Sequence, residues 1–225
     1  CGERGSYSKT DHDATFMHGK EDYYNKTGIF KPYYNLQIGV SDEYILHMGI
    51  SPNPTDTKTW VPFFESYKSR YHTLPEYPVA DAGYGSYDNY MYCVKNNMKL
   101  YMKYNNYSKE KEPKFKKKLY NIKNMTKDGN QMISQDGLRY IYSHDINSRY
   151  TENLSISQRY EIDASQIEIA KEKGPPKSVG YSPVLMEFQE TAFKNLESEK
   201  GIKLRTNRSY QAEGVFGDIK HNMEY

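Results

Sequence analysis

The first part of the chain contains two stretches in which apolar and polar side chains roughly alternate. They are residues 34–40 and 44–50, and Ser41-Asp42-Glu43 lies between them. Alternation with a period of two is typical of a strand with one buried face, and a short polar connection between two such runs is typical of a hairpin. We therefore predict two antiparallel strands joined by a tight turn.

The spacing of apolar residues then becomes helical. Trp60, Phe63, Phe64 and Tyr67 recur three or four residues apart, which predicts a helix from about residue 55 to about residue 71. The prolines at 75 and 78 would end this element, because proline interrupts the hydrogen bonds of a helix.

A strand, a helix and another strand are expected next. Residues 78–80 form a short apolar strand, Gly83 and Gly85 mark a tight turn, and Ser86 can cap a helix that continues to about residue 97. Residues 98–104 would be the following strand. Two antiparallel strands followed by helix, strand, helix and strand indicate an α/β fold with a mixed sheet and flanking helices.

The remaining segments are more polar. We expect residues 1–30 to be loop with a short helix near residues 16–22, and residues 105–180 to be a partly ordered insertion with strands at 138–142 and 166–170 and a linker at 174–176. A helix over residues 183–199 would end at Gly201, and Asn207 or Ser209 would cap a last helix. The expected divisions are a polar segment (1–30), a first core part (31–107), an insertion (108–180) and C-terminal core helices (181–225).

The composition narrows the class of protein. Only 36% of the residues are hydrophobic but 24 are tyrosines, so we expect tyrosine rings to provide much of the core packing. The net charge of +2 does not by itself indicate nucleic acid. No apolar run approaches the roughly 20 residues of a membrane span, and the two cysteines indicate no disulfide framework. We expect a cytoplasmic protein and, because residue 1 is a cysteine, a fragment or processed product.

Asp81 is the first candidate for chemistry, because it follows a predicted buried strand directly. Active sites of open α/β sheets collect at the carboxyl ends of strands, and an acid there can bind a hard cation through oxygen. The alternative is that Asp81 caps the following turn or helix. Position in the sequence leaves these two interpretations about equally weighted.

Glu213 is the second candidate, and Lys220 follows it by seven residues. In a helix this spacing is about two turns, so a carboxylate and a lysine would leave the same face. An exposed, solvated Glu is the alternative. Gly214 and Gly217 favour the functional interpretation, because glycine inside a helix often marks close approach of another element, here the sheet edge that bears Asp81.

Several other polar groups have weaker claims. Arg205, Arg208, Lys220 and His221 could bind DNA phosphates, or form a solvated basic face. Residues 109–118 carry six lysines and follow three tyrosines, so this strip could contact nucleic acid, although an exposed loop is the stronger interpretation.

Two further features favour a structural interpretation. Asp11-His12-Asp13 with His18 fits a turn better than a metal cluster. Cys93 fits a packing residue better than a nucleophile.

Seven motifs in this order carry a resemblance to a known family. They are SYSKT (6–10), DATFM (13–17), KPYYNLQI (31–38), NPTDT (53–57), VADAGYGS (79–86), NRS (207–209) and AEGVFG (212–217). On these motifs the chain resembles the DDE transposases of bacterial insertion sequences, especially the group numbered eleven-eighty-two, related to the IS-four-like transposases. The resemblance covers most of residues 3–107 and 181–222.

The resemblance implies a ribonuclease-H-like mixed sheet and three carboxylates that hold two Mg²⁺ (or Mn²⁺) ions. Asp81 would be the second acid and Glu213 the third, both as metal ligands, and the first would belong to a strand that precedes Cys1. An absent first strand would leave a strand edge of the sheet without a partner. Lys220 matches the last position of a Tyr, Arg, Glu, Lys signature, and Arg208 lies one residue too far from Glu213 to match it.

Three functions follow as hypotheses. The leading one is a catalytic-core fragment of a DDE transposase, inactive alone, that would act on transposon ends and target DNA in the bacterial cytoplasm, at the nucleoid. A nuclease of the same fold and a non-catalytic DNA-binding remnant are the alternatives. No membrane partner is expected, and the sequence leaves open whether the protein is a homodimer.

Overall fold

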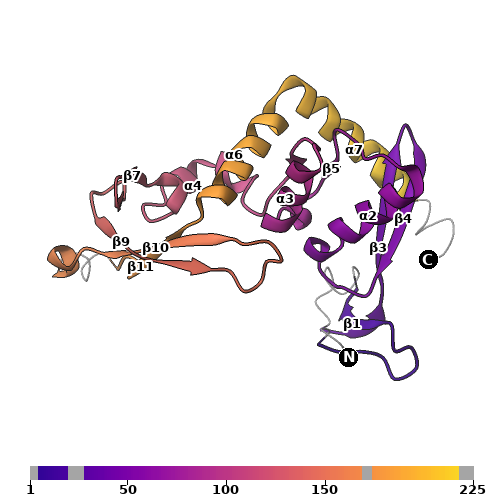
Figure 1. Ribbon diagram of the computed structural model, residues 1–225, viewed down its shortest axis with the longest axis horizontal. Coiled ribbons are helices and arrows are strands. Elements are labelled where there is room, and N and C mark those ends of the chain that lie inside the picture. Colours follow the sequence, from indigo (N-terminus) through magenta and orange to yellow (C-terminus); the bar gives the residue numbers. More distant parts are fainter. Residues whose placement is uncertain (1–4, 20–27, 169–173, 218–225) are drawn as a thin grey trace. The chain divides into compact units, whose positions relative to one another are not determined.

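The computed structural model describes residues 5–19, 28–168 and 174–217 (Figure 1). The chain divides into two compact units. Unit 1 is formed by residues 1–103 together with 194–225, and unit 2 by residues 104–193. None of the helices in the described ranges is long and apolar enough to cross a membrane. The fold is a mixed α/β one, as the sequence predicts.

In its described residues, unit 1 contains three short two-stranded sheets, three whole helices and the end of a fourth. Its strands are β1 (Thr15–His18), β2 (Phe30–Tyr33), β3 (Asn35–Ser41), β4 (Tyr44–Ser51), β5 (Val79–Ala80) and β6 (Tyr101–Met102). Its helices are α2 (Trp60–Tyr71), α3 (Tyr87–Lys95) and α7 (Glu199–Gly217), and 3₁₀ turns cover Asp56–Lys58 and Ala82–Tyr84. The pairs β1–β2 and β3–β4 are antiparallel and β5–β6 is parallel.

The predicted hairpin is confirmed as β3–β4. Ser41 pairs with Tyr44, so Asp42 and Glu43 form a two-residue loop, and both have positive φ angles of 50° and 69°. Such a turn has the twist that antiparallel strands require. The hairpin contains a register shift between Gly39 and Val40.

The strand–helix–strand prediction after residue 78 is also confirmed. The Ser86 hydroxyl accepts a hydrogen bond from the Asn89 amide at the start of α3, which is the expected capping interaction. Tyr90 in α3 is fully buried, and its hydroxyl donates to the carbonyl oxygen of Met102 in β6 at 3.0 Å. A tyrosine thus fills the core and satisfies its hydroxyl inside it, as the composition suggested.

The predicted helix near residues 16–22 is wrong within the described residues. Thr15–His18 form strand β1, which pairs with β2, and the rings of His18 and Phe30 lie 3.8 Å apart between centroids. A partner strand fifteen residues ahead overrides the weak local helical preference of this segment. Residues 20–27 lie outside the described residues.

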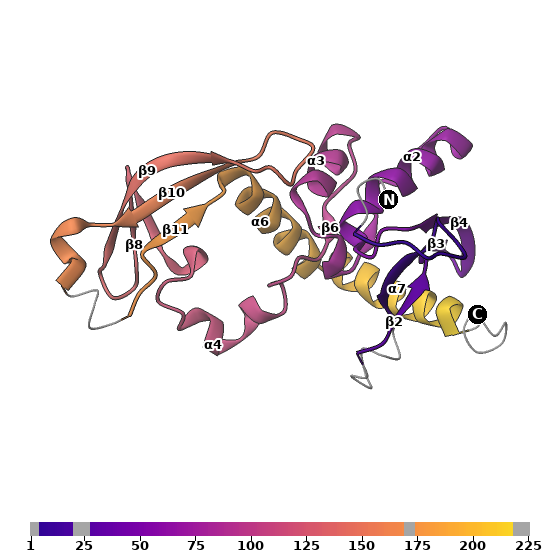
Figure 2. The same cartoon turned by 90° about the horizontal axis from the view of Figure 1, so that it is seen from below.

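Unit 2 is built around a five-stranded antiparallel sheet in the order β11-β10-β9-β8-β7 (Figure 2). The strands are β7 (Thr126–Asp128), β8 (Gln131–Ile133), β9 (Arg139–Asn147), β10 (Ile156–Ile162) and β11 (Ser178–Tyr181). Two further helices are α4 (Pro113–Lys116) and α6 (Pro183–Glu197), the second of which continues into unit 1. The core under the sheet consists of Met132, Leu138, Tyr140, Tyr160 and Val179.

The prediction that residues 105–180 are irregular and only partly ordered is therefore wrong, because they contain a five-stranded sheet. Their assignment as an insertion stays a prediction. The strand expected at residues 138–142 is present and longer, but residues 164–166 form a 3₁₀ turn rather than the start of a strand. Gly174-Pro175-Pro176 leads into β11 inside unit 2 and does not separate units. The strands were hidden because polar residues occupy their exposed positions and only long-range pairing makes them regular.

Gly201 does not end the helix before it. The break lies at Ser198, whose hydroxyl accepts from the Gly201 amide and caps the start of α7. Gly201 is buried inside α7, where a Cβ atom would lie 2.0 Å from the carbonyl oxygen of Asn195. The residue is glycine because the chain folds back closely at this corner, and α7 begins well before the predicted caps Asn207 and Ser209.

Candidate active site

Asp81 stands at the carboxyl end of β5, where the sequence placed it. Its backbone is extended (φ −74°, ψ 173°), and its side chain makes no capping hydrogen bond to the 3₁₀ turn that follows. The side chain is about half exposed, and Oδ2 accepts from the Arg208 guanidinium at 2.5 Å. The Asp81 side chain therefore does not cap the turn. Its carboxylate instead binds the Arg208 guanidinium.

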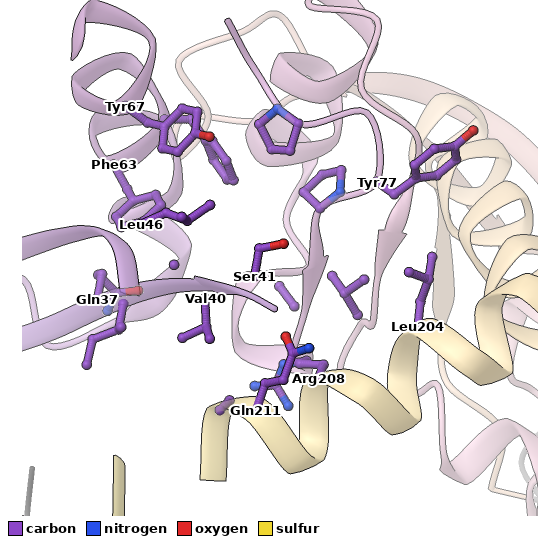
Figure 3. Close-up of a pocket in the computed structure, with 18 of the residues that line it drawn as sticks. Gln37, Val40, Ser41, Leu46, Phe63, Tyr67, Tyr77, Leu204, Arg208 and Gln211 are labelled. Atoms are coloured by element: carbon purple, nitrogen blue, oxygen red, sulfur yellow. The ribbon is translucent and has the colours of Figure 1, made fainter. Parts of the chain in front are cut away.

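Arg208 comes from α7, which is 127 positions away in the chain. Helix α7 packs against β3 and β5, and Figure 3 shows Arg208 beside β5. The guanidinium is 31% exposed, so solvent and a ligand can reach it. The fold therefore brings together two of the residues that the sequence singled out, one acid and one base.

Glu213 lies on a different face of α7. From Arg208 to Glu213 the helix turns through about 140°. The Glu213 carboxylate accepts from the Ser209 hydroxyl at 2.9 Å and lines a cavity of about 480 Å³. The other residues that line this cavity are Lys103, Ile202, Arg205, Thr206, Ser209 and Tyr210. The pairing of Asp81 with Glu213 in one site stays a prediction.

The basic residues around Glu213 have separate surroundings. Arg205 forms an ion pair with Glu197 at 3.6 Å and shares the cavity of Glu213. Lys220, and with it the predicted two-turn pair, lies outside the described residues. Gly214 and Gly217 have open space where a Cβ atom would be, so the prediction that they allow close approach to the sheet is wrong.

A polar network that the sequence did not identify as part of the site lies beside the Asp81 turn. The Asp56 carboxylate accepts from Asn35 at 2.9 Å and more weakly from Gln37 at 3.4 Å. The Gln37 amide also donates to Asn35 at 2.7 Å and accepts from the Tyr84 hydroxyl. Gly83 packs on Asp56, since a Cβ atom there would lie 2.9 Å from the carboxylate. Three motifs, at residues 31–38, 53–57 and 79–86, thus meet in space.

Charge couples this network to the site. Burial and the nearby charge of Asp56 raise the pKa of Tyr84, so its hydroxyl stays protonated and remains a donor to Gln37. The charges of Arg208 and Asp81 also act on Tyr84. The network therefore supports the turn that carries Asp81, and its signal in the sequence was the Asn-x-Gln and Asn-Pro-Thr-Asp patterns.

The lysines of residues 109–118 lie at the surface, but the tyrosines before them cannot stack on nucleic-acid bases. Tyr104 and Tyr107 are each 2% exposed, so their rings cannot stack on bases. Lys111 lies over the Tyr107 ring at 4.5 Å, and Phe115 anchors α4 in the interior of unit 2. This arrangement agrees with the interpretation of the strip as an exposed, charged loop.

The structural interpretations of Asp11 and Cys93 also hold. Asp11 accepts from the Asp13 amide within a turn and from the Tyr34 hydroxyl at 2.7 Å. Cys93 is fully buried in α3, and burial raises the pKa of its thiol to about 12. A thiol that stays protonated near neutral pH and is shielded from solvent is a packing residue.

The acids that the described residues bring together do not complete a metal site. Within residues 5–19, 28–168 and 174–217, no three His, Cys, Asp or Glu side chains are grouped so that they could hold an ion. Two Mg²⁺ or Mn²⁺ ions need carboxylates that converge from separate elements. Asp81 faces Arg208 and Glu213 faces Ser209, so a two-ion site would need further ligands and a rearranged Asp81.

Comparison with known protein families gives a match. The sequence model of a family described as "Transposase DDE domain" matches residues 4–223, which is nearly the whole chain. No curated protein and no solved structure matches the chain significantly.

Proposed function

Since the chain belongs to the transposase DDE domain family, we propose that it is the catalytic core of a DNA transposase with a ribonuclease-H-like sheet. Its substrate would be DNA, at transposon ends and at the target, and its reaction phosphodiester cleavage followed by strand transfer. Within the family we place it in the group numbered eleven-eighty-two. The observation that carries the proposal is the Asp81–Arg208 pair, because it joins a strand-end acid to a phosphate-binding type of side chain.

The pair suggests how DNA would enter the site. A guanidinium binds a phosphate with two parallel hydrogen bonds, so a DNA phosphate would compete with Asp81 for Arg208. Both side chains are partly exposed, which keeps the cost of separating them small. Binding of the DNA backbone to Arg208 would then release the Asp81 carboxylate, close to the bound phosphate.

Glu213 is the second proposed acid, and the basic groups near it would hold neighbouring phosphates. Arg205 and Lys103 line the same cavity as Glu213. Divalent metal ions, when bound, would polarise the scissile phosphate and the attacking oxygen. The acids described here would supply part of the ligand set, with Asp81 and Glu213 on separate elements.

DNA binding tests the role of Arg208. We expect Arg208→Gln to weaken binding of a short duplex and to lower the slope of log affinity against log salt by about 0.9, the loss of one phosphate contact. The matched control is Lys203→Gln, which removes the same charge from an exposed position of α7 that does not line the Glu213 cavity. Equal effects of the two variants would show only a general loss of positive charge and would contradict the assignment.

Cleavage tests the acids. The chain alone, with labelled transposon ends, a target plasmid and Mn²⁺, should form little or no product if it is inactive alone. Where it does form product, Asp81→Asn and Glu213→Gln should each lower the yield by about 100-fold or more. Asp88→Asn, on α3, should leave it within about twofold of the starting chain. Cut ends without joined product would favour a nuclease. DNA binding without cutting or joining, together with a Mn²⁺ affinity that Asp81→Asn and Glu213→Gln do not lower, would favour the non-catalytic remnant.

A further inference from the structure

The lysine-rich strip at residues 109–118 is a positively charged surface of unit 2 that the Asp81 site does not include. Six lysines against two glutamates give the strip a net charge of +4, which exceeds the +2 of the whole chain. All six lysines are exposed. A short exposed segment with this much charge of one sign attracts ligands of the opposite sign.

The fold holds the middle of the strip in a fixed conformation. The Phe115 ring is buried and anchors α4 in unit 2. The side-chain amide of Asn124 donates to the carbonyl oxygens of Phe115 at 2.7 Å and of Lys118 at 3.1 Å. Lys114, Lys117 and Lys118 are three or four residues apart around this single helical turn, so they are neighbours on its surface.

The protein does not neutralise this group of lysines with its own acids. The Glu110 carboxylate binds Lys123 at 2.5 Å and accepts from the Tyr104 hydroxyl at 2.6 Å. Among the described residues, no ion pair involves either lysine of α4 or the following Lys117. Like charges three or four residues apart on a helix destabilise it by about 0.2–0.5 kcal/mol per pair. A bound polyanion would relieve this repulsion.

The chemistry of the strip fits the phosphates of a nucleic-acid backbone. Lysine binds a phosphate as a point charge, and such contacts carry no information about base sequence. Stacking on bases is not available, because Tyr104 and Tyr107 are buried. A membrane surface fits less well, since membrane-binding segments insert apolar side chains beside their cations and the one aromatic ring of the strip, Phe115, lies in the core.

We propose that the strip is a sequence-independent contact for the phosphate backbone of duplex DNA. The contact would add affinity equally at transposon ends and at any other duplex. The choice of DNA rests on the proposed function of the chain, whereas the choice of a polyphosphate rests on the charge and exposure of the strip. Each lysine that contacts a phosphate contributes about 0.9 to the slope of log affinity against log salt.

The salt dependence of DNA binding tests the strip in the full chain. The probe is a fluorescent duplex of about 20 base pairs, or two helical turns. We expect Lys114→Gln/Lys117→Gln to lower the slope by about 1.8 and to weaken binding by about tenfold or more at about 0.1 M salt. A second duplex of unrelated sequence should show the same change. Lys114→Arg/Lys117→Arg should keep the slope of the starting chain, because the charge remains.

Two comparisons localise the effect. Arg149→Gln/Lys177→Gln removes two positive charges from exposed positions of unit 2 outside the strip, and it should leave the slope nearly unchanged. In an Arg208→Gln background the strip variant should still lower the slope by about 1.8, because Arg208 belongs to unit 1. Circular dichroism should show that all variants are folded.

Three results would overturn the proposal. Equal slopes for the strip variant and its control would show only an effect of net charge. A change confined to one of the two duplexes would mean that bases are read. Binding to polyglutamate or to vesicles of anionic lipid that the strip variant weakens, with duplex binding unchanged, would make an acidic protein or a membrane the partner.

Failure of the strip and failure of the proposed function give different results. An unchanged slope for the strip variant beside a normal effect of Arg208→Gln would overturn the strip alone. An effect of the strip variant beside equal effects of Arg208→Gln and Lys203→Gln would support the strip and contradict the assignment of Arg208.

Discussion

The Asp56 network allows a stability prediction whose size follows from the structure. Asp56→Ala removes the Oδ1 oxygen, which accepts a strong hydrogen bond from Asn35 at 2.9 Å and a weak one from Gln37 at 3.4 Å. A hydrogen bond to a charged group contributes about 1.5–3 kcal/mol. Gln37 keeps its bonds to Asn35 and Tyr84, so the weak contact adds little. We therefore expect the free energy of unfolding of unit 1 to fall by about 2–3 kcal/mol.

The single tryptophan of the chain makes this measurable for unit 1 alone. Trp60 is buried at the start of α2, so its fluorescence reports unfolding of unit 1 even if unit 2 unfolds separately. With a urea dependence of about 1–3 kcal/mol per M, a loss of about 2–3 kcal/mol should lower the midpoint by about 0.7–3 M.

Two control variants show whether a lower midpoint comes from the lost hydrogen bonds of Asp56. Asp56→Asn keeps an amide oxygen in a similar position, so its free energy of unfolding should fall by about half as much as that of Asp56→Ala. Asp128→Ala, on the exposed β7, should not move the midpoint. An Asp56→Ala midpoint equal to that of Asp128→Ala would refute the reasoning, because the network would then contribute nothing to the turn that bears Asp81.

Three other predictions concern buried positions. Gly201→Ala should destabilise unit 1 by about 2 kcal/mol or more in the same urea assay, despite the better helix propensity of alanine, because its Cβ would clash with the Asn195 carbonyl; an unchanged midpoint would contradict the close corner. His47 is buried, and burial and the charge of Arg70 lower its pKa below 6.5, so the unfolded chain binds the proton first. Its contribution to stability is complete above about pH 6.5 and is lost as the pH falls from there through the lower pKa of the folded chain. The midpoint of His47→Gln should therefore change less between about pH 7.5 and pH 5.5 than that of the starting chain. In a Cys1→Ser background, Cys93 should resist an aromatic disulfide reagent at about pH 8 until urea is added; rapid labelling of the folded chain would contradict its role in packing.

The parts of the fold that sequence could predict are those specified by local pattern. The β3–β4 hairpin, the Ser86 cap of α3 and the position of Asp81 after β5 each depend on residues that are close in the sequence, at most 16 positions apart as in the pair Asn35–Ser51. The five strands of unit 2 could not be read in this way. Their polar positions are exposed, and it is pairing between distant segments that makes them regular, as with β10 between β9 and β11.

The site divides in the same manner. Sequence alone identified Asp81, Glu213 and Arg208 as chemically capable residues and, through ordered motifs, pointed to the transposase DDE domain family, which the family match confirms. It could not decide which of them meet. The helix period turns Glu213 away from Arg208, and the packing of α7 on β3 and β5 sets Arg208 against Asp81. That contact spans 127 positions and depends on the path of the chain through three dimensions, which is why only the tertiary structure could decide it.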